Sequence, residues 1–217
     1  MVELYDAMGS LRAVRRLKPD PIPEQVMRRV LQAAAWAPTG GNVQPFRILV
    51  VQDKNHKEKI QSWYFEEWQK YTEPNRKALP NMPETARIDA EKTLRAGDYL
   101  ADHMAEVPAL LVFCFNPDYM AITDSELDRP SVVGGGSVYT AVQNVMLACR
   151  AEGLGCVLTT LLCYKEAEIK SLLNIPAEWG TCAHVPIGYP VLKGHGPISR
   201  RPIEKLTFVD QWGEFFT

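Results

Sequence analysis

The sequence has little net charge and no long apolar run. Its 24 Lys and Arg residues nearly balance 26 Asp and Glu residues, which leaves a formal net charge of -2. Nucleic-acid-binding domains are usually clearly basic, so this balance argues against a nucleic-acid partner. No apolar run approaches the length of a membrane span, and residues 1–6 carry acids without a long apolar region. We therefore expect neither a membrane partner nor a secretory signal.

Cysteine is scarce and shows no pairing motif. The five cysteines all lie in apolar segments, and none belongs to a C-x-x-C pair. An odd number without such a pair predicts reduced thiols and a cytoplasmic location. Cys149, Cys156 and Cys163 recur every seven residues, but Gly153 and Gly155 interrupt any common helix. Small buried hydrophobic side chains explain them better than a redox or metal site.

Recognisable catalytic motifs are missing as well. None of the four histidines has a Cys, His or carboxylate at metal-ligand spacing, so we predict no metal site. His184 lies in an apolar strand-like segment, where it is either a catalytic base or a structural histidine with satisfied ring nitrogens. No G-x-S-x-G elbow occurs, and Gly134–Ser137 is no P-loop because no G-K-[ST] follows. We predict no catalytic side chain and expect a cofactor to carry the chemistry.

The remaining composition is that of an ordinary globular protein. The 217 residues are 46% hydrophobic and 23% charged, which is enough for a sizeable core. No repeat or linker is visible, so we expect one domain over 1–217 with a variable helical excursion at 53–105. Apolar periodicity predicts helices at 23–36, 53–71, 86–105, 138–152 and 165–173, and strands at 46–51, 109–115, 155–160 and 182–188. That order indicates a mixed α/β or an α+β fold.

Four segments lead to more specific expectations. Strand 46–51 is apolar without alternation, which predicts a central strand covered on both faces. Residues 72–83 contain three prolines and predict a loop. The aromatic stretch Trp63–Tyr71 is either a lid over a pocket or a satellite core. The apolar tail Phe208–Phe216 is expected to pack on another part of the fold or on a second subunit.

Two cationic clusters and one glycine-containing turn are the candidate binding features. Arg12–Lys18 holds four cations between apolar residues, and Arg200–Arg201 forms a second cluster. Such runs are often solvated faces, but arginines also make bidentate bonds to phosphate oxygens. In the turn 37–46, glycines let the backbone approach a ligand, and Asn42 and Gln44 suit the edge of a heterocycle. By itself the turn is a plain helix stop; together the three features fit a phosphate-bearing cofactor.

Three stretches resemble the nitroreductase family of FMN-dependent oxidoreductases. They are residues 12–23, residues 33–46, and the set from Ala141-Val142-Gln143-Asn144 through Gly153-Leu154-Gly155 and Gly188-Tyr189-Pro190 to Arg200-Arg201-Pro202. Their order and spacing make the combination specific, although each alone is weak. The resemblance implies an α+β sandwich with a central mixed β-sheet flanked by helices. It also implies a domain-entwined homodimer with two FMN sites at the subunit interface.

The resemblance further implies which residues contact FMN. The first cationic cluster and the C-terminal pair resemble the arginines that hold the phosphate. The turn resembles one that reaches the flavin from the partner subunit, and residues 159–161 resemble a segment whose backbone faces the ring near N5. Ala13 stands where many members have Ser, so a hydroxyl contact to phosphate is missing. The implied set is Arg12, Ala13, Arg15, Arg16, Pro38, Thr39, Gly40, Asn42, Gln44, Thr159, Thr160, Leu161, Arg200 and Arg201.

The implied activity is ping-pong hydride transfer. NADH or NADPH delivers hydride to FMN and leaves, and a small aromatic acceptor such as a nitroaromatic or a quinone then takes the electrons. Two alternatives stay open. One is flavin chemistry on a specific metabolite, either dehalogenation or oxygen-dependent ring cleavage. The other is a non-catalytic FMN-binding protein for storage or redox sensing, with Trp63–Tyr71 as a plug over the pocket.

Overall fold

A four-stranded antiparallel sheet forms the centre of the molecule. In the computed structural model, which describes residues 2–216, the strand order is β1-β2-β4-β3. All three pairings within the described residues are antiparallel, so the sheet within this chain is not the mixed sheet that the resemblance implies. The strands are β1 (Phe46–Val51), β2 (Ala109–Phe115), β3 (Gly155–Cys156) and β4 (Gly180–Gly188). The helices are α1 (Leu4–Ser10), α2 (Glu24–Ala35), α3 (Lys54–Ala78), α4 (Glu84–His103), α5 (Gly136–Ala151) and α6 (Glu166–Leu173).

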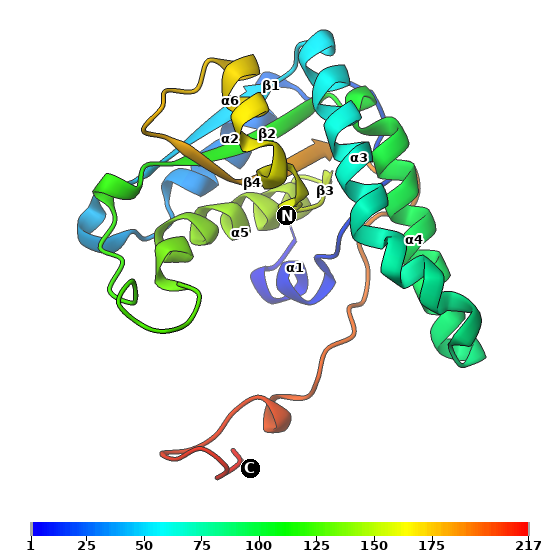
Figure 1. Cartoon of the computed structure of the whole chain (residues 1–217), viewed down its shortest axis with the longest axis vertical. Helices are drawn as coiled ribbons and strands as arrows, with labels where there is room; N and C mark the ends of the chain where they lie inside the picture. The colour runs from blue at the N-terminus through cyan, green and yellow to red at the C-terminus, as the bar shows by residue number, and fades with distance from the viewer. Residues whose placement is uncertain (1, 217) are drawn as a thin grey trace.

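Helices cover both faces of the sheet (Figure 1), and the expected α+β class is confirmed. Strand β2 is buried along nearly its whole length, as its unbroken apolar run predicts. Successive side chains of a strand point to opposite faces. Leu111 therefore joins the core with α2 and α5, and Leu110 joins the second core with α3, α4 and α6. The two cores share one sheet.

Two expectations about strands are wrong. Strand β1 pairs only with β2, so it is an edge strand with half-exposed side chains and not a central one. The expectation failed because a continuous apolar run is also compatible with an antiparallel edge strand that helices partly cover. The strand expected at 155–160 is regular only at Gly155 and Cys156, with a single further bridge between Thr159 and His184. Between them the chain leaves the sheet.

The loop expected at 72–83 is wrong for residues 72–78, because α3 continues through Pro74 to Ala78, and only residues 79–83 connect α3 to α4. A proline inside a helix costs about 3 kcal/mol, since it removes one backbone donor and crowds the preceding turn. Contacts with α4 offset that cost. The carboxylate of Asp98 accepts hydrogen bonds from Trp68 Nε1 at 2.8 Å and from Arg76. Pairing of the two helices therefore outweighs the local preference for a turn.

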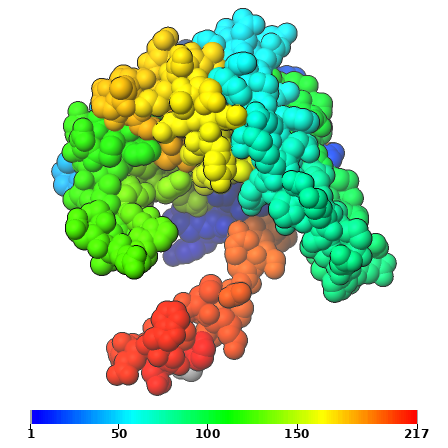
Figure 2. All heavy atoms as spheres, in the orientation of Figure 1, coloured from blue at the N-terminus to red at the C-terminus, as the bar shows by residue number. Residues whose placement is uncertain are grey.

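The aromatic stretch Trp63–Tyr71 forms a satellite core at the root of the α3–α4 hairpin. Tyr64 and Trp68 are buried in the second core, and their rings stack with centroids 6.4 Å apart. The helices approach closely here because α4 presents Gly97, where a Cβ atom would overlap the Trp68 ring. Beyond this point, residues 73–93 contain no buried side chain. That distal end projects from the body of the molecule (Figure 2).

The C-terminal tail does not pack on its own chain. Figures 1 and 2 show it leaving the body and ending well away from the sheet, beyond the bond that joins the Gly196 N–H to the Ser10 carbonyl. Trp212 is 92% exposed, and Phe208 stacks only on Trp212 and Phe215 within the tail. Packing on a second subunit stays a prediction. None of the helices in residues 2–216 is long and apolar enough to cross a membrane.

His184 of β4 is fully buried, and neither ring nitrogen has a hydrogen-bond partner among the described residues. A catalytic base needs access to a substrate, so that interpretation is wrong. The expectation of satisfied ring nitrogens is wrong too. Burial disfavours the charged ring and lowers the pKa of His184 to about 3. The neutral imidazole simply fills space in the second core.

Replacing Gly97 with alanine tests the approach of α3 and α4. The new methyl group must displace the Trp68 ring, and overpacking of this kind typically costs about 1–3 kcal/mol in the free energy of unfolding. Urea denaturation measures the loss. Gly9→Ala is the matched control, because no atom lies within 4 Å of a Cβ at Gly9. Equal stability of Gly97→Ala and the wild type would show that the helices do not meet there.

His184→Leu tests how the buried imidazole couples stability to pH. The pKa of His184 is lower in the folded chain than the usual unfolded value of about 6.5, so folding favours the neutral ring. The stabilisation is present above about pH 6.5 and is lost as the pH falls. Between about pH 6.5 and 5.5 the wild type should lose about 1 kcal/mol more than the variant. Urea titrations at both pH values measure this difference, and parallel losses would contradict it.

Candidate functional site

The first cationic cluster lies on a segment that is anchored to the body of the fold by its apolar residues. The backbone N–H of Val14 donates to the carbonyl of Cys156 at 2.9 Å, and that of Lys18 donates to the carbonyl of Tyr189 at 2.7 Å. The segment thus runs between β3 and the end of β4. Its buried residues are Leu11, Val14 and Leu17, and its exposed or half-buried residues are Arg12, Ala13, Arg15 and Arg16.

Arg12 lies against the segment that leads into the C-terminal tail. Its Nε donates to the carbonyl oxygen of Gly194 at 2.8 Å, and its guanidinium carbon lies 3.6 Å from the position of a Cβ at Gly196. Arg200 follows Gly196 by four residues, which an extended chain spans in about 14 Å. The second cationic cluster therefore begins within a short reach of the first.

Arg15 and Arg16 face the root of the α3–α4 hairpin. The guanidinium carbon of Arg16 lies 4.9 Å from the centre of the Tyr99 ring, a cation–π geometry. Burial raises the pKa of Tyr64, while a hydrogen bond with the Thr159 side chain and the charge of Arg15 act in the opposite direction. Tyr64 is buried in the second core, as the helical spacing of its aromatic neighbours predicts for a core residue.

Residues 159–161 leave the sheet beside these groups. Thr159 exchanges two backbone hydrogen bonds of 2.9 Å with His184, and its Oγ1 accepts from the Leu161 N–H at 3.3 Å. Thr160 is exposed at the turn and Leu161 is half-buried. This geometry presents the backbone at Thr160 at the surface, four residues after the Cys156 carbonyl that binds Val14 of the cationic segment.

The turn from Pro38 to Gln44 is held in a strained conformation. Gly41, Asn42 and Gln44 all have positive φ angles, of 57°, 56° and 50°. Glycine adopts such angles freely and asparagine tolerates them, but they are uncommon for glutamine. The Gln44 N–H donates to Thr39 Oγ1 at 3.1 Å, and its Nε2 donates to Asn42 Oδ1 at 3.2 Å. These bonds fix the two amide side chains against each other.

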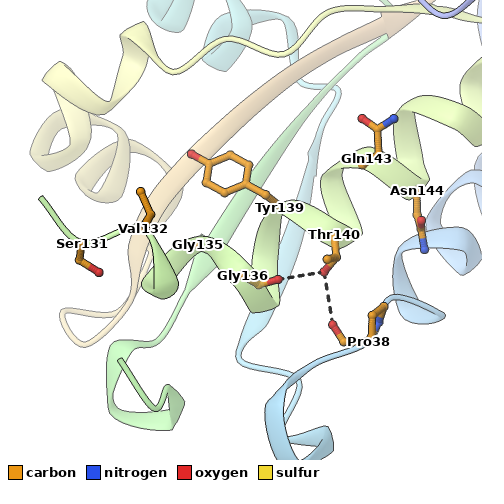
Figure 3. Close-up of a pocket in the computed structure, with 9 residues that line it drawn as sticks. All are labelled: Pro38, Ser131, Val132, Gly135, Gly136, Tyr139, Thr140, Gln143 and Asn144. Atoms are coloured by element: carbon orange, nitrogen blue, oxygen red, sulfur yellow. Dashed lines mark hydrogen bonds between the residues drawn. The ribbon is translucent and has the colours of Figure 1, made fainter. Parts of the chain in front are cut away.

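A hollow of about 700 Å³ opens beside this turn. Figure 3 shows the turn meeting the N-terminal half of α5, where Thr140 Oγ1 donates to the carbonyl of Pro38 at 3.3 Å. The opposite wall is a loop held by Asp124. The Ser131 hydroxyl and then the Val132 N–H donate to this carboxylate and hold the pKa of Asp124 well below its usual range. The lining residues are Pro38, Ser131, Val132, Gly135, Gly136, Tyr139, Thr140, Gln143 and Asn144.

The turn and the arginines lie at opposite ends of α5. Near its N-terminus, Ser137 Oγ accepts from the N–H of Gly40 at 3.1 Å. At its C-terminal end, Arg150 Nε donates to Ser10 Oγ at 2.9 Å, two residues before Arg12. The 13 residues from Ser137 to Arg150 rise about 20 Å along a helix. Within one chain, the implied FMN residues therefore form two separate half-sites.

The half-site of Arg12, Ala13, Arg15, Arg16 and residues 159–161 is called the arginine half-site below, and Pro38–Gln44 with its hollow is called the turn half-site. Arg200 and Arg201 lie on the tail, within reach of the arginine half-site. In residues 2–216, no group of three His, Cys, Asp or Glu residues is arranged to hold a metal ion.

Known proteins resemble this chain along most of its length. It is 27% identical over 195 residues to an NADH dehydrogenase of Thermus thermophilus, with 90% of each chain covered. It is 31% identical over 191 residues to an iodotyrosine deiodinase of Thermotoga neapolitana, with 88% of this chain and 90% of that protein covered. It is also 31% identical over 188 residues to a 5,6-dimethylbenzimidazole synthase of Rhodospirillum rubrum, with 82% and 78% covered.

Solved structures share the fold. An oxidized iodotyrosine deiodinase bound to FMN and 3-iodo-L-tyrosine superposes with a TM-score of 0.67 at 24% identity, covering 98% of this chain and 100% of that one. An NADPH:FMN oxidoreductase from Vibrio harveyi complexed with NAD+ gives a TM-score of 0.67 at 17% identity, covering 97% and 78%. The Nitroreductase family matches residues 10–189. The family resemblance of the sequence is thereby confirmed, and this chain belongs to the nitroreductase family.

Proposed function

We propose that this chain is an FMN-dependent oxidoreductase that takes hydride from NADH or NADPH and passes it to a small aromatic acceptor. The observation that carries the proposal is the arginine half-site, where the cationic segment bonds to β3 and the exposed turn at Thr160 follows β3 directly. Bound FMN would supply the redox chemistry, with donor and acceptor visiting in turn. The side chains of this protein hold, orient and shield the reacting groups.

The arginine half-site has the donor chemistry that a phosphate monoester requires. Arg12 uses Nε on Gly194, which leaves its two terminal nitrogens for an anion. Arg15 is half-buried next to it along the segment, and Arg200 and Arg201 begin within reach. Paired guanidinium groups bind phosphate oxygens through charge-assisted hydrogen bonds. Residues 159–161 then offer backbone groups to the edge of the flavin ring.

A homodimer is the second part of the proposal. One chain separates its two half-sites by the length of α5, so a complete site needs the turn of another copy. Large apolar side chains near the turn and on α1 are exposed in the single chain, including Trp36 at 74% and Tyr5 at 85%. Patches of this kind usually mark interfaces. We also propose that residues 1–217 form one domain, since both cores share the sheet, in a cytoplasmic protein.

A second candidate is reductive dehalogenation of an aromatic substrate. It is supported by the 31% identity to the Thermotoga neapolitana protein named iodotyrosine deiodinase. The same fold carries several named activities, so fold alone does not choose between the two reactions. Release of iodide from iodotyrosine with reducing equivalents present would favour this candidate over a general nitroaromatic or quinone reductase.

The central test is a visible spectrum of the purified protein reconstituted with FMN under anaerobic conditions. We expect bound oxidised flavin, which loses its visible absorbance when NADH or NADPH is added and regains it when a quinone or nitroaromatic follows. Flavin that binds but is not reduced by either nucleotide would favour the storage or sensing alternative. A protein that takes up no FMN would contradict the whole proposal.

The double variant Arg12→Ala/Arg200→Ala tests the phosphate assignment. Loss of two charge-assisted hydrogen bonds, each worth about 1.5 kcal/mol or more, should raise the dissociation constant for FMN by about 100-fold or more. Fluorescence quenching of free FMN measures it. Arg28→Ala is the control, because Arg28 is exposed on α2 and pairs only with Glu24 of its own helix among the described residues. An unchanged flavin affinity would show that other groups bind the phosphate.

A further inference from the structure

His195 is a buried polar residue that belongs to neither half-site. It lies after β4 in the segment that leads to the tail, and it is 7% exposed. Its Nε2 lies 2.8 Å from the carbonyl oxygen of Leu154, a fully buried residue between α5 and β3. A carbonyl only accepts, so Nε2 carries the hydrogen and donates it. This bond ties the root of the tail to the body of the fold.

The residues on either side of His195 hold the N-terminal segment. The Gly194 carbonyl accepts from Arg12 Nε at 2.8 Å, and the Gly196 N–H donates to the Ser10 carbonyl at 3.1 Å. Gly194 has a φ of 70°, a conformation that suits glycine and turns its carbonyl group out of the extended direction. Residues 194–196 are called the clamp below, because Gly194 and Gly196 bond to the N-terminal segment while His195 between them bonds to Leu154.

We propose that His195 is a positioning residue for flavin-nucleotide binding: through the clamp it aims the terminal nitrogens of Arg12 at the phosphate. This inference rests on the proposed function. An exposed arginine has many rotamers, and ordering it on binding costs conformational entropy. The Nε bond to Gly194 and the contact with Gly196 remove most of that freedom beforehand. His195 holds the carbonyl that fixes the guanidinium plane.

The charges around His195 keep it neutral. The positive charges of Arg12 on the N-terminal segment and Arg150 on α5 act on the ring, and Nδ1 is buried without a partner among the described residues. Burial is the main cause that lowers the pKa of His195; the Leu154 bond opposes it, and the two arginines lower it further. A protonated ring would add a third cation and an unsatisfied buried N–H. The clamp is therefore intact above about pH 6.5 and weakens as the pH falls.

The experiment compares the full-length wild type with His195→Leu and His195→Gln, using FMN and riboflavin as ligands. Leucine fills the space but loses the donor, so the dissociation constant for FMN should rise about tenfold, as for one weakened charge-assisted hydrogen bond. Glutamine keeps an N–H donor of similar reach and should stay within about twofold of the wild type. Riboflavin lacks the phosphate, so its affinity should be the same in all three proteins.

A pH profile supplies a readout that a merely structural role would not move. Between about pH 7.5 and 5.5 the wild type should lose more FMN affinity than His195→Gln, which cannot be protonated. The FMN phosphate titrates in both measurements, and the two proteins share every other ionisable group, so the difference between the profiles isolates His195. Hydrogen exchange should also show faster exchange at Gly196 in His195→Leu. If that variant does not fold, the comparison of the wild type with His195→Gln carries the test.

The outcomes separate the inference from the proposed function. Wild-type protein that binds no FMN contradicts the proposed function itself. FMN binding that is equal in all three proteins, with superimposable pH profiles, leaves the proposed function standing and overturns the clamp. A loss of riboflavin affinity equal to that of FMN in His195→Leu also overturns it, because the effect would then not pass through the phosphate.

Discussion

The length of α5 is the constraint on which the candidate site depends. The helix is packed against the sheet and α2 through Val142 and Val145, and Asn144 Nδ2 donates to the Ala33 carbonyl at 3.0 Å. A helix buried in this way cannot shorten or bend to bring its ends together. The groups attached to its two ends therefore keep a fixed separation in every copy of the chain. Any ligand that needs both ends must find them on different molecules.

The sequence predicts the parts of the fold that depend on local pattern. The seven apolar residues of β2 and the apolar face of α2 are dictated by burial, and both elements appear where the pattern places them. The alternation of cations and apolar residues in 11–18 likewise predicts an anchored segment with outward arginines. Pro74 is an exception to prediction from local pattern: proline favours a turn, but contacts with α4 stabilise the helix that contains it. The bond between His195 and Leu154 cannot be predicted from local sequence patterns, because it joins segments far apart in the chain.

The structure places the arginine half-site and the distal hairpin in different environments. The arginine half-site is built on backbone bonds between β3, the N-terminal segment and the end of β4, so it depends on the fold itself. The distal part of the α3–α4 hairpin, residues 73–93, has no fully buried side chain, although Leu79 packs against the second core and Arg76 pairs with Asp98. Most of its residues can therefore change with little loss of packing energy, and relatives with one fold carry three different activity names. Residues that determine substrate selectivity can change most easily in such a region.

The edge position of β1 bears on the tendency of the chain to aggregate. An unpaired strand edge is a template on which other polypeptides add by backbone hydrogen bonds, and this is a common start of aggregation. Natural proteins blunt such edges with charge, and β1 carries Arg47 near its beginning. The guanidinium carbon of Arg47 lies 5.2 Å from the centre of the Trp179 ring, which keeps the charge beside the strand. Arg47 thereby keeps a charge beside the exposed edge of β1, which disfavours fibrillar stacking on this strand.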